Sequence, residues 1–134
     1  MDGEVVGAIE RGFLVLVAAV AGDTGEDAAW LERKLLTLRV FSDDAGKMNR
    51  SVIDIKGALL LVSQFTLAAE TSKGARPSFL RAMDPELARP FLERLVAKLR
   101  MSIEVQTGRF GSDMQIELVN DGPVTLWLDS KEPR

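Results

Sequence analysis

Short apolar runs, each closed by turn residues, alternate along this chain with two stretches whose apolar residues recur at helical spacing. Runs at 4–10 and 13–20 flank a charged residue followed by glycine, and so do runs at 51–55 and 58–66, which predicts two β-hairpins. Strands paired in this way, with two interspersed helices, predict an α+β domain built mainly on an antiparallel, barrel-like sheet. Further strands are expected at 103–107, 114–120 and 124–129.

The two helical stretches carry their own start signals. Thr24 and Asp27 resemble a capping box, and the apolar residues that follow predict a helix at 26–39. Asp84-Pro85 gives the second helix an N-cap with proline at its first position. Pro90 lies within the second stretch, and because proline removes a helical hydrogen bond, the helix is expected to restart there.

Length and composition favour one soluble domain that spans residues 1–134. A chain of 134 residues that is 46% hydrophobic can bury one sizeable core. No apolar stretch is long enough to cross a bilayer, and the run at 13–22 lacks a cleavage pattern, so no membrane association is expected. The absence of cysteine fits a reducing compartment, and a cytoplasmic protein is the expectation.

The absence of histidine, cysteine and tyrosine limits the chemistry that this chain can perform. A Ser-His-Asp triad, a cysteine nucleophile and an ordinary zinc site all require imidazole or thiolate. Hydrolysis near neutral pH must therefore use a carboxylate, a lysine, backbone groups, a metal held by oxygen atoms, or a group of the substrate itself. We expect no cofactor and no bound metal.

Two polar segments stand at predicted strand ends, where binding groups are often presented. Ser63-Gln64-Phe65-Thr66 closes one apolar run, and Asn120-Asp121-Gly122-Pro123-Val124-Thr125 joins two others. The plainest interpretation of the first segment is that its polar groups satisfy backbone atoms. The plainest interpretation of the second is a tight turn with the usual trans proline bond. On residue chemistry alone these interpretations are favoured.

Considered together, the motifs resemble those of the D-aminoacyl-tRNA deacylases, and the resemblance covers nearly the whole chain. It continues through Lys47-Met48-Asn49-Arg50-Ser51, Gly74-Ala75-Arg76-Pro77-Ser78-Phe79 and Thr107-Gly108-Arg109-Phe110-Gly111. The resemblance implies a hydrolase that cleaves the ester between a D-amino acid, or glycine, and the 3′ end of a tRNA, as a proofreading step in translation. It also implies a homodimer whose active site is shared between subunits.

The resemblance assigns roles to residues of this sequence. Ser63, Gln64, Phe65 and Thr66 would form the catalytic pocket around the terminal adenosine and its amino acid. Nothing in the chain supplies a base for Thr66, so it is interpreted as a positioning group, with backbone N–H groups and the ribose 2′-hydroxyl assisting catalysis. A cis Gly122-Pro123 bond from the neighbouring subunit would exclude L-amino acids. The remaining substrate-binding candidates are Met114, Met48, Asn49 and Arg109.

The charge balance is compatible with a protein that contacts only the end of a tRNA. The net charge of −3 and pI near 5.0 argue against coating of nucleic acid. Several cations nevertheless adjoin the motifs, and two interpretations remain open: scattered solubilising charges, or a local patch for a single-stranded RNA end. These cations are Lys47, Arg50, Lys73, Arg76, Arg81 and Arg109.

The chain departs from the family pattern in two places. Relatives usually carry a further strand before the equivalent of Asp2, so an N-terminal strand is expected to be missing and one sheet edge to be unpaired. Ala68-Ala69-Glu70 stands where an aromatic residue is more usual. Two alternatives therefore stay open: a related deacylase with a trans Gly-Pro bond that acts on L-aminoacyl-tRNA, and a catalytically weak dimeric module that binds tRNA ends. The preferred amino acid and tRNA are not determined by the sequence.

Overall fold

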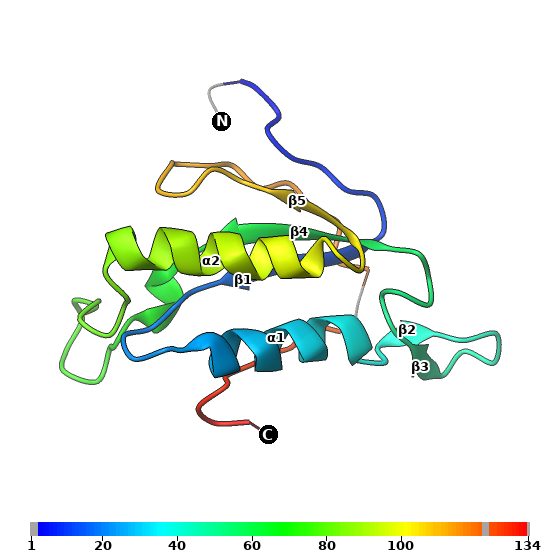
Figure 1. Ribbon diagram of the computed structural model, residues 1–134, viewed down its shortest axis with the longest axis horizontal. Helices are drawn as coiled ribbons and strands as arrows, with labels where there is room; N and C mark the ends of the chain where they lie inside the picture. Colours follow the sequence, from blue (N-terminus) through cyan, green and yellow to red (C-terminus); the bar gives the residue numbers. More distant parts are fainter. Residues whose placement is uncertain (1–2, 122–123, 134) are drawn as a thin grey trace.

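Three parallel strands form the centre of the protein (Figure 1). The computed structural model describes residues 3–121 and 124–133. β1 (Gly12–Val17), β4 (Ala58–Ser63) and β5 (Glu104–Thr107) lie in the order β1-β4-β5, and both neighbouring pairs are parallel. Because the strands point the same way, their carboxyl ends meet at one edge of the sheet, which we call the carboxyl edge.

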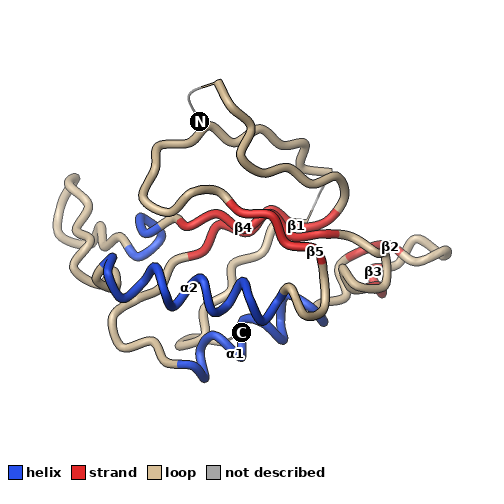
Figure 2. The backbone as a smooth tube through the Cα atoms, turned by 45° about the horizontal axis from the view of Figure 1, so that its top comes forward, coloured by secondary structure: helices blue, strands red, loops and turns tan. Residues whose placement is uncertain are grey.

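Two helices cover one face of this sheet (Figure 2). α1 (Gly25–Thr37) lies between β1 and β4 in the chain, and α2 (Pro85–Leu99) lies between β4 and β5. Both connections step across the sheet in the same direction, so connections of one hand place both helices on the same face. The core between the helices and the sheet consists of Val17, Leu35, Val52, Leu59, Leu61, Leu92, Leu95, Leu99 and Val105.

The helix start signals were interpreted correctly, and the expected restart at Pro90 was wrong. Thr24 and Asp27 form the capping box at α1, and the Asp84 carboxylate accepts the N–H of Glu86 at α2. α2 is one 15-residue helix that includes Pro90. Three of its leucines are buried against the core. Burial of each contributes roughly 1.5–3 kcal/mol, which offsets the strain of one internal proline.

Neither predicted hairpin forms, and the sheet is not mainly antiparallel or barrel-like. Residues 4–9 form no strand, and β1 pairs with β4 instead of with the segment before it. Gly12 has a φ of 154°, and a Cβ there would overlap the carbonyl oxygen of Ala58. This glycine therefore permits close approach of two strands that are distant in sequence, and does not make a hairpin turn. The three-stranded sheet is open, so the expectation of a barrel is corrected as well.

The segment at 51–56 is a turn and not a strand. Ser51 N–H donates to the Asp54 carboxylate at 2.8 Å, and Asp54 N–H donates to the Ser51 hydroxyl at 3.1 Å, which closes the turn reciprocally. The antiparallel pair in this region is β2 (Phe41–Ser42) with β3 (Met48–Arg50). Local side-chain bonds thus outweighed the alternating apolar pattern.

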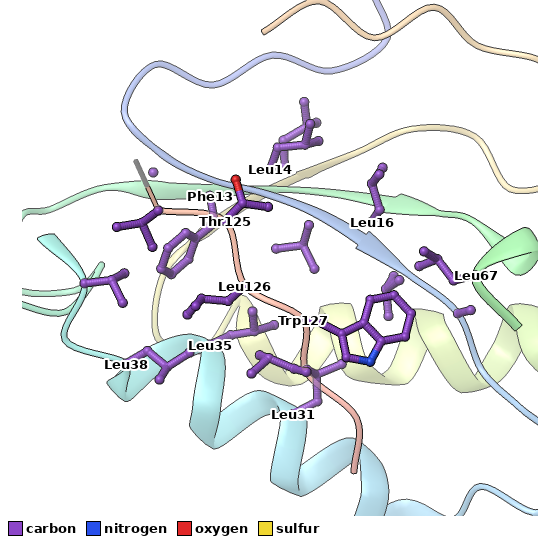
Figure 3. Close-up of a pocket in the computed structure, with 18 of the residues that line it drawn as sticks. Phe13, Leu14, Leu16, Leu31, Leu35, Leu38, Leu67, Thr125, Leu126 and Trp127 are labelled. Atoms are coloured by element: carbon purple, nitrogen blue, oxygen red, sulfur yellow. The ribbon is translucent and has the colours of Figure 1, made fainter. Parts of the chain in front are cut away.

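The C-terminal segment, which we define as the described residues from 114 to 121 and from 124 to 133, follows a different path from the one expected. The strand predicted at 103–107 is confirmed as β5, whereas the described residues of the two later strands form none. Thr125, Leu126 and Trp127 pass between β1 and α1 (Figure 3). Within the described ranges, no helix has the length and apolar character needed to cross a membrane.

Candidate functional site

The carboxyl edge fixes the backbone of the Ser63 to Thr66 segment. Ser63 is the last residue of β4 and pairs with Val17 of β1, and the N–H of Gln64 donates to the Val17 carbonyl at 2.7 Å. A short 3₁₀ helix, η1 (Phe65–Ala68), begins directly afterwards. Ser63 and Gln64 are half-buried, while Phe65 and Thr66 are exposed. The segment is therefore anchored by its backbone and presents its side chains at the strand end.

Gln64 and Thr66 contact each other within this segment. The Gln64 Nε2 group donates to the Thr66 Oγ1 atom at 2.5 Å. An amide nitrogen has no basic lone pair and cannot remove the hydroxyl proton. This contact orients the threonine hydroxyl without activating it as a nucleophile.

Phe79 joins the carboxyl edge, although it was not among the predicted site residues. Its ring lies 5.3 Å from that of Phe65, edge-on at 71°, and the two side chains are 38% and 57% exposed. The loop before Phe79 is closed by a bridge between Glu70 and Ser78. An aromatic residue directly after a loop rich in glycine and proline was the available signal, because exposed aromatics commonly mark binding surfaces.

The end of β5 brings Met114 to the same edge. Gly108 follows β5, and its N–H donates to the Leu61 carbonyl at 3.3 Å. A Cβ at Gly108 would overlap the thioether of Met114, so the methionine packs directly on this glycine. The next residue, Arg109, forms an ion pair of 3.8 Å with Glu4 and is 58% exposed. Such exposed pairs contribute little stability, roughly 0–1 kcal/mol.

Met48 and Asn49 lie elsewhere in the chain. Both belong to β3, and its partner strand β2 packs at the amino end of β1, where the rings of Phe41 and Phe13 are 5.0 Å apart. Figure 1 shows this β2-β3 pair at the opposite end of the sheet from the point where β4 finishes. Asn49 hydrogen-bonds the Asp43 carboxylate. One chain alone therefore does not bring these two candidates to Ser63.

Gly122 and Pro123 fall outside the described residues, and so does the predicted cis bond between them. On either side of them, Asn120 Nδ2 donates to Thr125 Oγ1 at 3.1 Å. Thr125 lies beside Phe13 at the amino end of β1, whereas Leu67 of η1 lies beyond its carboxyl end (Figure 3). Four residues of strand separate Phe13 from Val17, which corresponds to about 13 Å. The residues that flank the Gly-Pro pair are thus remote from Ser63 in their own chain.

The described residues bring together part of the predicted site. Ser63, Gln64, Phe65, Thr66 and Met114 share the carboxyl edge, with Arg109 close to it. Across those same residues, no group of three or more carboxylates gathers in a way that could hold a metal ion. The arrangement offers a polar strand end, exposed rings and a methionine, which suits a ligand with both polar and aromatic parts.

Comparison with known proteins gives the family. The family model described as "D-Tyr-tRNA(Tyr) deacylase" matches residues 1–129. The D-aminoacyl-tRNA deacylase of Herminiimonas arsenicoxydans is 56% identical over 94% of this chain and 85% of its own length. That of Thermomicrobium roseum is 50% identical over 100% of this chain and 88% of its own length.

Solved structures agree with this assignment. The structure titled "c-Myc DNA Unwinding Element Binding Protein" has a TM-score of 0.87 and 41% identity, and the match covers 92% of this chain and 85% of that one. A probable eukaryotic D-amino acid tRNA deacylase has a TM-score of 0.72 at 18% identity over 86% and 83% of the two chains, a likeness of fold alone. With the family match over residues 1–129 and at least half of all positions identical to these two bacterial relatives, the chain belongs to the D-Tyr-tRNA(Tyr) deacylase family.

Proposed function

We propose that this protein hydrolyses the ester that joins a D-amino acid, or glycine, to the 3′ end of a tRNA. Relatives that are 50% and 56% identical carry the name D-aminoacyl-tRNA deacylase. The observation that carries the proposal in the structure is the Ser63 to Thr66 segment, held by the end of β4 beside Phe79 and Met114. A substrate of this kind places the enzyme where translation occurs, in the cytoplasm.

The chemistry assigned to the site needs no side-chain nucleophile. A water oxygen adds to the ester carbonyl, and the tetrahedral oxyanion then expels the ribose 3′ oxygen, which takes up a proton. Phe65 and Thr66 open the 3₁₀ turn, and the first N–H groups of a helical turn have no carbonyl to bond within it. We assign these two N–H groups to the oxyanion, because donors positioned before reaction stabilise the charge that develops. The ribose 2′-hydroxyl orients the water.

The exposed rings and cations fit the end of an RNA strand. Bases stack on aromatic side chains with roughly 1–3 kcal/mol per base, and Phe65 and Phe79 are both exposed at the site. Arg81 lies in the same region and pairs with Glu70 at 3.7 Å, in a contact that solvent weakens. A phosphate can replace such an exposed carboxylate partner at little cost.

We assign the complete active site to a homodimer in which Gly122-Pro123 of one subunit meets Ser63 to Thr66 of the other. The remoteness of Thr125 from the carboxyl edge of its own chain supports this arrangement. Exposed apolar side chains on the C-terminal segment support it too, since Val119 is 92%, Trp127 58% and Leu126 54% exposed. A two-fold axis presents the same surface on both subunits, so both sites become complete at once.

One experiment tests the activity and its chirality. The purified chain is incubated with one tRNA charged in turn with D-tyrosine, L-tyrosine and glycine, and ester loss is timed. Rapid loss from the D-tyrosyl and glycyl esters, with the L-tyrosyl ester preserved, is the expected result. Loss from the L-ester would point to the related deacylase with a wider pocket, and binding without hydrolysis would point to a tRNA-end-binding module.

A further inference from the structure

A charged cluster holds the C-terminal segment to the start of α1. The Lys131 Nζ atom lies 3.0 Å from Asp27 Oδ2 and 3.8 Å from Asp23 Oδ1. The two carboxylate side chains are only 14% and 9% exposed, and the lysine is 48% exposed. Because Lys131 is 104 residues from Asp27, this contact joins the two ends of the chain.

The two carboxylates are fixed by backbone groups independently of the lysine. Asp27 Oδ2 accepts the N–H of Thr24 at 2.9 Å, and Asp23 Oδ2 accepts the N–H of Val20 at 2.8 Å. Asp23 Oδ1 is enclosed and has no hydrogen-bond partner among the described residues. Two neighbouring carboxylates repel each other, so a cation between them is favoured by both. Lys131 therefore occupies a site that is built to receive it.

The backbone of the C-terminal segment contributes little to holding it in place. Its printed backbone hydrogen bonds, from Asp121 to Val119 and from Glu132 to Asp129, stay within the segment as far as it is described. Leu126 and Trp127 lie along β1 and α1 as side chains only (Figure 3). Pro123 precedes Lys131 by eight residues, so a change of position at Lys131 is transmitted along a short stretch of chain.

We propose that Lys131 is a positioning residue which, through Asp23 and Asp27, sets where the Gly122-Pro123 loop lies and so how strictly L-aminoacyl esters are rejected. The inference rests on the proposed function, because it takes the Gly-Pro pair as the chirality filter. Discrimination by steric exclusion is sensitive to small displacements of the obstacle. Loss of the lysine charge should therefore affect the rejected substrate more than the accepted one.

The test uses Lys131→Met in the full-length protein, with Lys131→Arg as the conservative variant and Lys98→Met, on the exposed last turn of α2, as the matched control. We expect Lys131→Met to keep the D-tyrosyl rate within about threefold and to lower the ratio of D to L rates about tenfold. Lys131→Arg and Lys98→Met should keep the ratio. An unchanged ratio in Lys131→Met would overturn the proposal.

Amide hydrogen exchange gives a readout that does not require activity. Lys131→Met should speed exchange at 118–130 and leave the amides of β4 unchanged. If the natural chain hydrolyses no ester, the proposed function fails, while unaltered exchange at 118–130 would separately overturn the positioning role. If Lys131→Met does not fold, Asp23→Asn removes one charge of the cluster while an amide oxygen can still accept the Val20 N–H, and the same shift in exchange is expected.

Discussion

The carboxyl edge and the C-terminal segment both carry a family motif, but they are held in place by different interactions. At the carboxyl edge, Ser63 ends a strand that is hydrogen-bonded on both sides, between β1 and β5. In the C-terminal segment, the described residues form no strand, and apolar side chains together with Lys131 hold them against α1 and β1. One motif is positioned by backbone pairing and the other by side chains.

This difference teaches where the active site can be complete. A strand end inside a sheet has a fixed position in a single chain, because its backbone partners are covalently continuous with it. A segment with exposed side chains such as Val119 and Trp127 has surface left to bury. A second copy of the chain can supply the missing cover and, at the same time, the missing half of the site.

The largest expected effect tests the rigid half of the comparison. Leu59 lies in the middle of β4 and is 0% exposed. Leu59→Ala should lower the free energy of unfolding by about 2–5 kcal/mol, because it leaves a cavity in the core. Leu80→Ala is the matched control, since Leu80 is 90% exposed and should change stability by less than about 0.5 kcal/mol. Urea denaturation measures both, and equal effects would contradict the assignment of the core.

The next effect separates the two motifs by their roles in catalysis. Gly122→Ala should lower turnover of D-tyrosyl-tRNA about a hundredfold, close to 2.7 kcal/mol in the barrier, because a methyl group would enter the space next to the substrate. Thr66→Ala should keep turnover within about tenfold, because the hydroxyl positions and does not attack. An inactive Thr66→Ala protein that still folds and binds RNA would favour a covalent mechanism.

The third effect concerns the acid sensitivity of the anchor at α1. The Thr24 N–H and then the Lys131 contact lower the pKa of Asp27 from 3.8 to about 2. Folding therefore favours the charged form, so the contribution to stability is full above about pH 4 and is lost as the pH falls toward 2. Asp27→Asn should cost roughly 1–2 kcal/mol at pH 7, and this cost should shrink over the same acid range.

Asp23 provides the internal control for that titration. Burial raises the pKa of Asp23, although the N–H of Val20 opposes the shift. A raised pKa means that the charged form is disfavoured in the fold, so this term favours folding at low pH and is lost as the pH rises. Asp23→Asn should therefore cost less stability at pH 7 than Asp27→Asn. Urea titrations at several pH values compare the two, and the opposite order would contradict the assignment.

The smallest expected effect tests the proposed cover of the C-terminal segment. Val119→Ser should leave unfolding of the isolated subunit unchanged within about 0.5 kcal/mol, because the side chain is 92% exposed. It should raise the dissociation constant of the dimer about tenfold, roughly 1.4 kcal/mol, if a second copy covers this residue. Sedimentation and light scattering at micromolar concentration provide the measurement. A stable monomer with full activity would refute the shared site.

Signals that act over a few residues were sufficient to predict the helices. Thr24 with Asp27 and Asp84 with Pro85 mark helix starts through bonds made within one turn, and both helices begin where expected. The end of β4 at Ser63 was also predicted, because an apolar run gives way there to polar residues. The run from Ala58 to Val62 is continuous and not alternating, which is typical of a strand in a parallel sheet, and this signal went unused.

Which strands pair, and which residues meet, was decided by the tertiary structure. Gly12 and Lys56-Gly57 have the composition of hairpin turns, yet Gly12 faces Ala58 across a parallel pair formed over an intervening helix. Met48 and Met114 are chemically identical candidates, and only the fold separates them, one in β3 and the other on Gly108. A sequence encodes local bonds directly, whereas contacts between distant residues depend on how the whole core packs and, at the Gly-Pro motif, on a surface that one chain leaves uncovered.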